Sequence, residues 1–274
     1  MKPDPSSLKY IGRNTVSDYL TFMIFRFRKK KTLKPIFDAP LRPEVPFFAI
    51  GDLHGCDSLF RKLLSSLEEL APSEARLVLV GDYVDRGDDS AEVLRRLFRM
   101  QADAGEEMMI CLKGNHDQML LDFLDDPQGT GPRWLRYGGL QTLASYGLQG
   151  VPQTAPETRW LETRDRLREA VSADIEHWLR ALPTRWQTGN VMVCHAGADP
   201  MRPPEEQSDR SLLWGHPEFE STPRNDGTWV VHGHTITDHP RPESGRIPVD
   251  TGAYATGRLT AALVETGKVQ FLST

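Results

Sequence analysis

The sequence contains only three cysteines, and no two of them form a Cys-x-x-Cys pair. Cys56, Cys111 and Cys194 are far apart, so neither a disulfide framework nor a cysteine-type structural zinc site is expected. Cys111 and Cys194 lie within apolar runs, where we expect them to be small buried core residues. A reducing, cytoplasmic setting fits this cysteine usage best.

Long apolar runs are also absent, and a transmembrane helix would need about 18 or more consecutive apolar residues. The apolar segment at residues 19–27 precedes a basic segment at 28–31, whereas a secretory signal carries its charge first. We interpret residues 1–44 as an N-terminal extension of the main domain. Contact of its apolar segment with a membrane surface is the weaker alternative.

The chain has no excess of basic residues. Lysine and arginine together number 33 against 38 acidic residues, which gives a net charge of −5. Binding of nucleic acid by bulk electrostatic attraction is therefore not expected. With 274 residues, of which 39% are apolar, the chain is long enough to bury one sizeable core.

Short apolar runs recur after Pro46, and each ends in small or polar residues. The runs are continuous rather than alternating, which is typical of strands buried on both faces. Two helical stripes, at 57–70 and 89–98, separate the first three runs, so we expect an α/β fold with layered sheets. The predicted strands are 47–50, 77–80, 108–112, 191–194, 229–231 and 247–249, with a β-hairpin at 259–272.

The region from about 118 to 188 has a mainly helical pattern. We interpret it as a helical insertion near the functional site, within a single main domain that spans residues 45–274.

Polar residues follow the predicted strands at their carboxyl ends, which is where ligands bind in open α/β sheets. Asp52 and His54 alternate by two positions and would point to the same side of an extended chain. A carboxylate with an imidazole suits a divalent transition ion. Asp82, after the second strand, has two oxygens and could contact two ions.

Five segments carry the chemistry, and they read GDLHG, GDYVDRG, GNHD, HAG and HGHT in chain order. Together they resemble the calcineurin-like metallophosphoesterases, most closely the phosphoprotein phosphatase branch with its small bacterial and phage serine/threonine phosphatases. The resemblance covers roughly residues 46–264. It implies a layered β-sandwich flanked by helices.

The resemblance also implies a site with two metal ions. The first ion would be bound by Asp52, His54 and Asp82, and the second by Asp82, Asn115, His195 and His234. Mixed nitrogen and oxygen ligands suit manganese, with iron or zinc as alternatives.

By the same resemblance, His116 would be the general acid, with Asp85 as its orienting partner. Arg86 would hold the substrate phosphate, with Asn115 and His116 also in contact with it. The reaction implied is hydrolysis of phosphomonoesters by a hydroxide that two metal ions activate.

Three further residues are candidates for supporting roles. His232 alternates with His234, and Asp250 begins a turn that matches one near the site in this branch. His216 stands shortly after Trp214, where bacterial relatives usually carry a phosphate-binding arginine. Arg210 or Arg224 could replace that arginine from nearby.

The expected activity is that of a broad-specificity serine/threonine protein phosphatase, with phosphorylated proteins or small phosphoesters as substrates. The alternative is a hydrolase of diadenosine polyphosphates. A nucleotide substrate would need a stacking surface, for which the candidates are Trp134, Tyr137, Trp160, Trp178 and Trp186. An inactive phosphate-binding scaffold is disfavoured because every predicted metal ligand is present.

Overall fold

The computed structural model describes residues 37–274, apart from residues 69, 71 and 73. The expected N-terminal extension, including its apolar segment at 19–27, therefore lies almost wholly outside the described residues. Within the described part, no helix is both long enough and apolar enough to cross a membrane.

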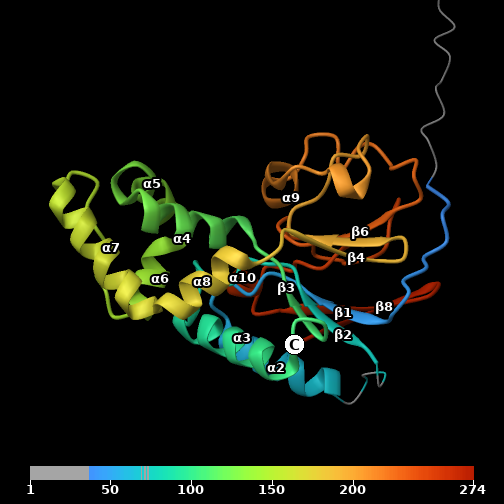
Figure 1. Ribbon diagram of the computed structural model, residues 1–274. Helices are drawn as coiled ribbons and strands as arrows, with labels where there is room; N and C mark the ends of the chain where they lie inside the picture. Colours follow the sequence, from blue (N-terminus) through green and yellow to red (C-terminus); the bar gives the residue numbers. More distant parts are fainter. Residues whose placement is uncertain (1–36, 69, 71, 73) are drawn as a thin grey trace, which may run out of the picture. The chain divides into compact units, whose positions relative to one another are not determined.

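Two β-sheets form the centre of the domain (Figure 1). The first sheet has the order β3-β2-β1-β8-β9, in which β1, β2 and β3 are parallel while β8 and β9 are antiparallel to their neighbours. The second sheet has the order β4-β5-β6-β7, in which β5, β6 and β7 are parallel. The bounds are β1 Phe47–Ile50, β2 Arg76–Leu79, β3 Met109–Cys111, β4 Arg185–Thr188, β5 Val191–Cys194, β6 Trp229–His232, β7 Arg246–Pro248, β8 Thr260–Glu265 and β9 Lys268–Ser273.

The alternation of side chains along the strands separates the core into layers. In β1, Phe47 and Ala49 pack between the two sheets, whereas Phe48 and Ile50 belong to the cluster that includes the helices. The side chains of the second sheet alternate in the same way. Val193 packs between the two sheets, whereas Met192 and Cys194, before and after it in β5, belong to a separate apolar cluster. Burial on both faces confirms the layered α/β fold that the continuous apolar runs predicted.

Helices cover the outer face of the first sheet, where α2 and α3 lie against it (Figure 1). A second group of helices follows β3, and α9 and α10 occur later in the chain (Figure 1). The bounds are α2 Asp57–Glu68, α3 Ser90–Ala104, α4 Asn115–Asp125, α5 Pro127–Trp134, η1 Leu135–Gly139, α6 Leu140–Ser145, α7 Glu157–Val171, α8 Ala173–Ala181, η2 Pro204–Glu206, α9 Asp209–Trp214 and α10 Ala253–Thr256.

The helical region ends earlier than the sequence suggested. Helix α8 ends at Ala181, and Arg185–Thr188 forms β4 instead of continuing the predicted helical stretch to about 188. Strand β4 is an edge strand paired only with β5, and Gln187 is exposed. An edge strand that is partly exposed lacks the continuous apolar run by which the other strands were predicted.

The segment just before residue 45 is part of the packed domain. Leu41 is 6% exposed and lies in the cluster between the sheets. The backbone nitrogen of Arg42 donates to the side chain of Asn190, and that of Glu44 donates to Thr188. Residues 41–44 thus cover the β4–β5 turn.

We expect Leu41→Ala to lower the free energy of unfolding by about 2–4 kcal/mol, because it removes a buried side chain between the sheets. Urea unfolding at 25 °C would measure this. Met201→Ala is the matched control, since Met201 is 68% exposed and its loss should change stability by less than about 0.5 kcal/mol. Equal effects of the two substitutions would show that residue 41 does not belong to the core.

Candidate metal centre

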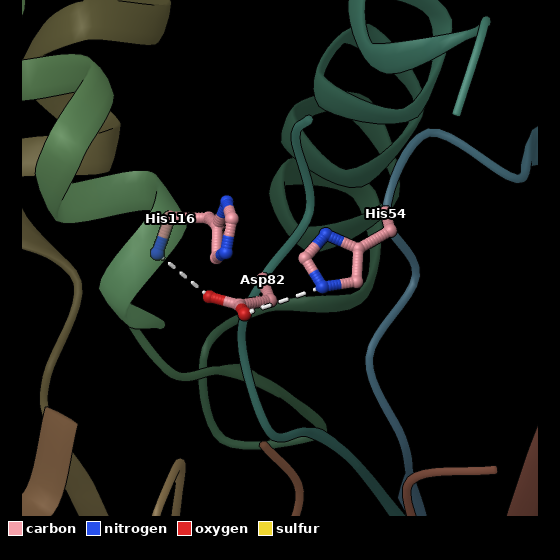
Figure 2. A group of neighbouring side chains, drawn as sticks. All are labelled: His54, Asp82 and His116. Atoms are coloured by element: carbon pink, nitrogen blue, oxygen red, sulfur yellow. Dashed lines mark hydrogen bonds and ion pairs between the residues drawn. The ribbon is translucent and has the colours of Figure 1, made fainter. Parts of the chain in front are cut away.

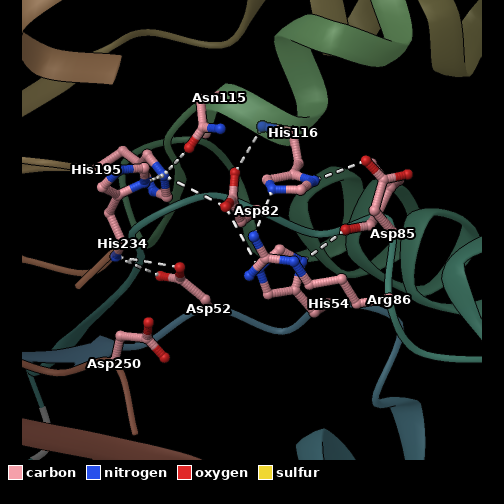
Figure 3. Close-up of polar contacts among 12 residues, drawn as sticks. Asp52, His54, Asp82, Asp85, Arg86, Asn115, His116, His195, His234 and Asp250 are labelled. Carbon is pink, nitrogen blue, oxygen red and sulfur yellow. Dashed lines mark hydrogen bonds and ion pairs between the residues drawn. The ribbon is translucent and has the colours of Figure 1, made fainter. Parts of the chain in front are cut away.

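The polar residues that follow the strands converge at one place (Figure 3). Asp52 and His54 follow β1; Asp82, Asp85 and Arg86 follow β2; Asn115 and His116 begin α4; His195, His234 and Asp250 follow β5, β6 and β7. The carboxyl ends of the parallel strands of both sheets therefore meet at a common site.

Asp82 lies at the centre of this group. Its Oδ2 is 3.4 Å from Nε2 of His54 and 3.4 Å from Nε2 of His195, while its Oδ1 accepts the backbone N–H of His116 at 2.8 Å (Figures 2 and 3). Two groups of side chains here could each hold a metal ion. They are His54, Asp82 and His116, and Asp82, His195 and His234. Asp82 is common to both groups.

Backbone carbonyls fix the orientation of two of the imidazoles. Nδ1 of His54 donates to the carbonyl of Val84 at 2.8 Å, and Nδ1 of His195 donates to the carbonyl of Val80 at 3.1 Å. The Nε2 atom of each ring is left to face Asp82. This pairing of one nitrogen with a carbonyl and the other with the site is typical of metal-binding histidines.

The other side of the site brings further ligand atoms together. Nε2 of His195 is 2.8 Å from Oδ1 of Asn115 and 3.2 Å from Nδ1 of His234. Nδ1 of His195 donates its proton to the carbonyl of Val80. Nε2 of His195, Oδ1 of Asn115 and Nδ1 of His234 therefore lie together as three possible ligand atoms. Such a donor set fits a cation of the transition series.

The electrostatics of the site also favour cations. Asp52, Asp82 and Asp250 are each at most 3% exposed. Burial raises the pKa of Asp52 well above its usual range, and repulsion from Asp250 raises it further. Burial opposes a charge on His195, yet Asp82 and Asp52 outweigh it and raise the pKa of His195 to about 9. Burial lowers the pKa of His54 to about 3 and that of His234 to about 4, which favours the neutral imidazole that metal ions bind.

His116 and Asp85 form a hydrogen-bonded pair at the edge of the site. Nδ1 of His116 donates to Oδ2 of Asp85 at 2.7 Å, and both side chains are buried. Asp85 also accepts from Nε1 of Trp134 at 3.0 Å and from the hydroxyl of Thr142 at 2.6 Å. Both of these donors come from the helical region after β3, so that region holds the carboxylate in place.

Arg86 contacts both His54 and His116. Its Nη2 donates to Nε2 of His116 and its Nη1 to Nε2 of His54, each at 3.0 Å. The Tyr254 ring stacks beside it, with the guanidinium carbon 4.8 Å from the ring centre. The guanidinium is therefore fixed next to Asp82 and facing the same centre.

Several site residues have a strained backbone. Of the seven non-glycine residues with positive φ in the described chain, five are His54, Asp82, Asp85, Arg86 and His234. Each such conformation costs on the order of 1–3 kcal/mol. The surrounding structure holds this strain at the positions where the predicted chemistry lies.

Glycines allow the loops of the site to approach one another closely. A side-chain carbon at Gly114 would come within 2.2 Å of Oδ1 of Asp82, and one at Gly233 within 2.1 Å of Oδ1 of Asp52. Glycine at these two positions is therefore required for both carboxylates to lie where they do.

Asp117 is a structural member of the site to which the sequence had assigned no role. Its carboxylate accepts the backbone N–H groups of Asp82, Tyr83 and Gly114, each at 2.9 Å, and is fully buried. It joins the loop after β2 to the start of α4. Its position as the third residue of a helix, where a carboxylate often caps the N-terminus, was the available signal.

The three candidates for supporting roles lie at different places. Asp250 lies near Asp52, and its Oδ1 accepts the N–H of Gly252 at 2.8 Å (Figure 3). His232 is buried and donates to the carbonyl of Gly233, and its ring packs 4.9 Å from Phe219 instead of facing Asp82. His216 lines a pocket of about 360 Å³ together with His234.

Among the arginines, Arg224 is not free to bind a phosphate. It is 7% exposed, pairs with Asp226 and donates to the carbonyls of Asp199 and Arg202. Arg210 is exposed on α9, and within residues 37–274 as described its side chain forms no hydrogen bond or ion pair. Arg133 instead lies with its guanidinium carbon 4.9 Å from the ring of Trp214, which lines the same pocket as His216.

Most of the aromatic residues considered for stacking are packed inside the domain. Trp134 and Trp160 are each 1% exposed, and Trp178 donates to Gln101. Trp186 packs against Phe47, with ring centres 5.1 Å apart. Of the five, Tyr137 is the one with a large exposed fraction, 49%.

Tyr254 is the aromatic residue at the site that the sequence analysis missed. Its ring lies 5.2 Å from that of His54, and it is 38% exposed. It belongs to α10, directly after the turn at Asp250 that was predicted to lie near the site. That proximity was the signal by which it could have been found.

Comparison with known proteins agrees with this geometry. The sequence pattern of the calcineurin-like phosphoesterases matches residues 45–238. A symmetrical bis(5′-nucleosyl)-tetraphosphatase of Ralstonia nicotianae is 30% identical over 80% of this chain and 89% of its own length. An asymmetrical one of Oceanobacillus iheyensis is 26% identical over 77% of this chain and 86% of its own length.

Two other similarities are shorter or more distant. Serine/threonine-protein phosphatase 1 of Salmonella typhimurium is 39% identical, over 34% of this chain and 38% of its own length. The crystal structure of a putative diadenosine tetraphosphatase has a TM-score of 0.57 and 23% identity, and covers 86% of this chain and 98% of that one. This last likeness supports the fold.

We expect Asp82→Asn to reduce the manganese content of metal-stripped and refilled protein below two ions per chain, because the substitution removes the charge shared by both ligand groups. Elemental analysis of the purified protein would measure the content. Asp103→Asn, at an exposed position on α3, is the control. Two ions retained in Asp82→Asn would argue against a bridging role.

Proposed function

The chain belongs to the calcineurin-like phosphoesterase family, and from that premise we propose that it hydrolyses bis(5′-nucleosyl) polyphosphates such as diadenosine tetraphosphate. The observation that carries this proposal is the extent of the match. Two relatives with that activity in their names align over about four-fifths of this chain and nearly nine-tenths of their own length, while two others named in the same way align over 58% and 27% of this chain. The protein phosphatase relative aligns over 34% of this chain.

The proposed substrate differs from the one first expected, while the class of enzyme does not. The chain is a hydrolase of the metallophosphoesterase type. The comparisons favour the alternative that the sequence analysis kept, a diadenosine polyphosphate hydrolase, over the serine/threonine protein phosphatase. A cytoplasmic location is part of the proposal, because the three cysteines are free thiols.

The side chains at the strand ends would hold two metal ions. We assign one ion to Asp52, His54 and Asp82 and the other to Asp82, Asn115, His195 and His234, with manganese favoured and iron or zinc as alternatives. The structure groups His54 and Asp82 with His116 and not with Asp52, whose carboxylate accepts the backbone N–H of His234, so Asp52 is included on its sequence motif. When bound, such ions polarise the phosphoryl oxygens and activate the attacking water.

His116 would supply a proton to the departing oxygen. Its Nδ1 is engaged by Asp85, so the Nε2 atom is the one that faces the site and Arg86. Asp85 fixes this orientation of the ring, and Trp134 and Thr142 fix Asp85. In this structure Nε2 accepts the hydrogen bond of Arg86, so action as the acid requires a second proton at Nε2 and transfer of the Arg86 hydrogen bond to a bound phosphate.

Arg86 would bind the phosphate that is attacked. Its guanidinium lies beside Tyr254, and the two Nη groups that contact His54 and His116 would turn to phosphate oxygens in a bidentate contact. Arg133 is a further cation beside Trp214, which lines the same pocket as His216 and His234.

A serine/threonine protein phosphatase remains the second candidate. It is favoured by the 39% identity to the Salmonella phosphatase over 92 residues. Both activities would use the same metal ligands, so the substrate has to be tested directly.

With metal-stripped protein refilled with Mn²⁺, we expect the kcat/KM for diadenosine tetraphosphate to exceed that for a phosphoserine peptide by at least about tenfold. Initial rates and separation of the nucleotide products would measure this, and the products would show which phosphoanhydride bond is cleaved. Faster turnover of the peptide would reverse the substrate assignment and leave the metal centre unaffected.

We expect His116→Asn to keep its manganese and to lose about 10²–10⁴ in kcat on diadenosine tetraphosphate, the range of a general acid. The metal content and the rate would be measured on the same preparation. His177→Asn, at an exposed position on α8, is the control. Unchanged turnover in His116→Asn would exclude the proposed proton donor.

A further inference from the structure

A pocket of about 570 Å³ adjoins Arg86 and is lined by residues of η1, α6 and α10. The described chain has seven exposed large apolar side chains, and three of them, Tyr137, Leu140 and Tyr254, line this pocket. A volume of this size is within the range of small-molecule sites. We propose that this pocket binds the base of a nucleotide whose phosphates lie at Arg86, an inference that rests on the proposed function.

The pocket lies directly beside the proposed phosphate site at Arg86. Tyr254 contacts both, because its ring lies 4.8 Å from the guanidinium carbon of Arg86 and also lines the pocket. A ligand with its phosphate at Arg86 would therefore extend directly over Tyr254. An aromatic ring next to the phosphate position is where a nucleoside attached to that phosphate could stack.

The kinked segment η1 forms another part of the lining. The backbone N–H of Arg86 donates to the carbonyl of Gly138 at 3.3 Å, and Gly138 has a φ of 122°. A side-chain carbon at Gly138 would come within 2.8 Å of the Arg86 side chain. The kink thus brings the helical insertion into contact with Arg86. Near Gly138 in the sequence, the side chains of Tyr137 and Leu140 are 49% and 48% exposed.

The charge of the pocket suits a nucleotide. Its charged lining residues are Arg86 and Arg136, and no acidic side chain lines it. This is a local excess of positive charge in a chain whose net charge is −5. Arg133 adds a further guanidinium beside Tyr137, at 5.9 Å from the ring centre. Gln141 offers an amide that can meet the polar edge of a base.

The same features do not match a phosphoserine peptide. A phosphoserine side chain has no ring to stack on Tyr137 or Tyr254. Each base that stacks on an aromatic side chain is stabilised by about 1–3 kcal/mol, which corresponds to about 5- to 150-fold in affinity. Exposed tyrosines beside Arg86 would therefore distinguish nucleotides from other phosphate compounds.

The test compares two inhibitors that share a non-hydrolysable diphosphonate and differ in the nucleoside. They are adenosine 5′-(α,β-methylene)diphosphate and methylenediphosphonate, measured against turnover of p-nitrophenyl phosphate by the Mn²⁺-loaded full chain. We expect the adenosine compound to bind at least about tenfold more tightly. In Tyr137→Ala this advantage should fall to about threefold or less, and Tyr137→Phe should retain it because the ring is kept.

Met108→Ala is the matched control, since Met108 is exposed to a similar degree, 44%, and does not line the pocket. An adenosine advantage that is absent in the parent, or that persists in Tyr137→Ala, would overturn the assignment of the pocket. The proposed function fails separately, if diadenosine tetraphosphate is not hydrolysed while the adenosine compound still binds through Tyr137.

Discussion

The position of the Asp82 carboxylate is the constraint on which the site depends. It is 1% exposed, and an unpaired charge at such a position is costly. The protein surrounds it with two imidazoles, the N–H of His116 and a loop that Asp117 holds through three backbone hydrogen bonds. The absence of a side chain at Gly114 is needed for the same reason, because any added carbon would meet Asp82. The close approach of Gly114, the positive φ of Asp82 and the buried carboxylate of Asp117 all contribute to placing this one charge between two histidines.

The stability of the domain has to support this arrangement. Five site residues with positive φ, together with buried Asp52 and Asp250, would destabilise the fold if they stood alone. The layers of apolar side chains on both faces of the strands provide the compensating burial, and in β1, β2, β3 and β5 they continue to the last residue of the strand. The strand ends are therefore rigid at the point where the polar residues begin, which is what a site of fixed geometry requires.

The buried carboxylate of Asp85 connects the site to the helical insertion. Its partners Trp134 and Thr142 lie on α5 and α6, and η1 between these helices contacts Arg86 through Gly138. The insertion thus has two roles at once. It orients His116 through Asp85, and its exposed side forms one wall of the pocket at Tyr137. A change of its sequence could alter the pocket while Trp134 and Thr142 keep the His116–Asp85 pair in place.

The sequence predicted the parts of this protein that local patterns determine. Strands 47–50 and 191–194 have the predicted bounds, since each is a continuous apolar run buried on both faces. The residues after these strands converge as expected, although the metal and catalytic roles assigned to them remain proposals. Strand β4 was missed, because a partly exposed edge strand carries no such run.

The roles of Trp134 and Tyr254 were not predicted because they depend on contacts between residues far apart in the sequence. The hydrogen bond of Trp134 to Asp85 joins residues 49 positions apart, and Tyr254 reaches Arg86 from the far end of the chain. Neither leaves a periodic pattern, so Trp134 could be considered a stacking residue and Tyr254 could be overlooked. Substrate choice depends on contacts of this kind. The metal ligands follow strand ends and can be read from short motifs, whereas the surface that would recognise a nucleoside is assembled from an insertion and a four-residue helix that meet only in the folded chain.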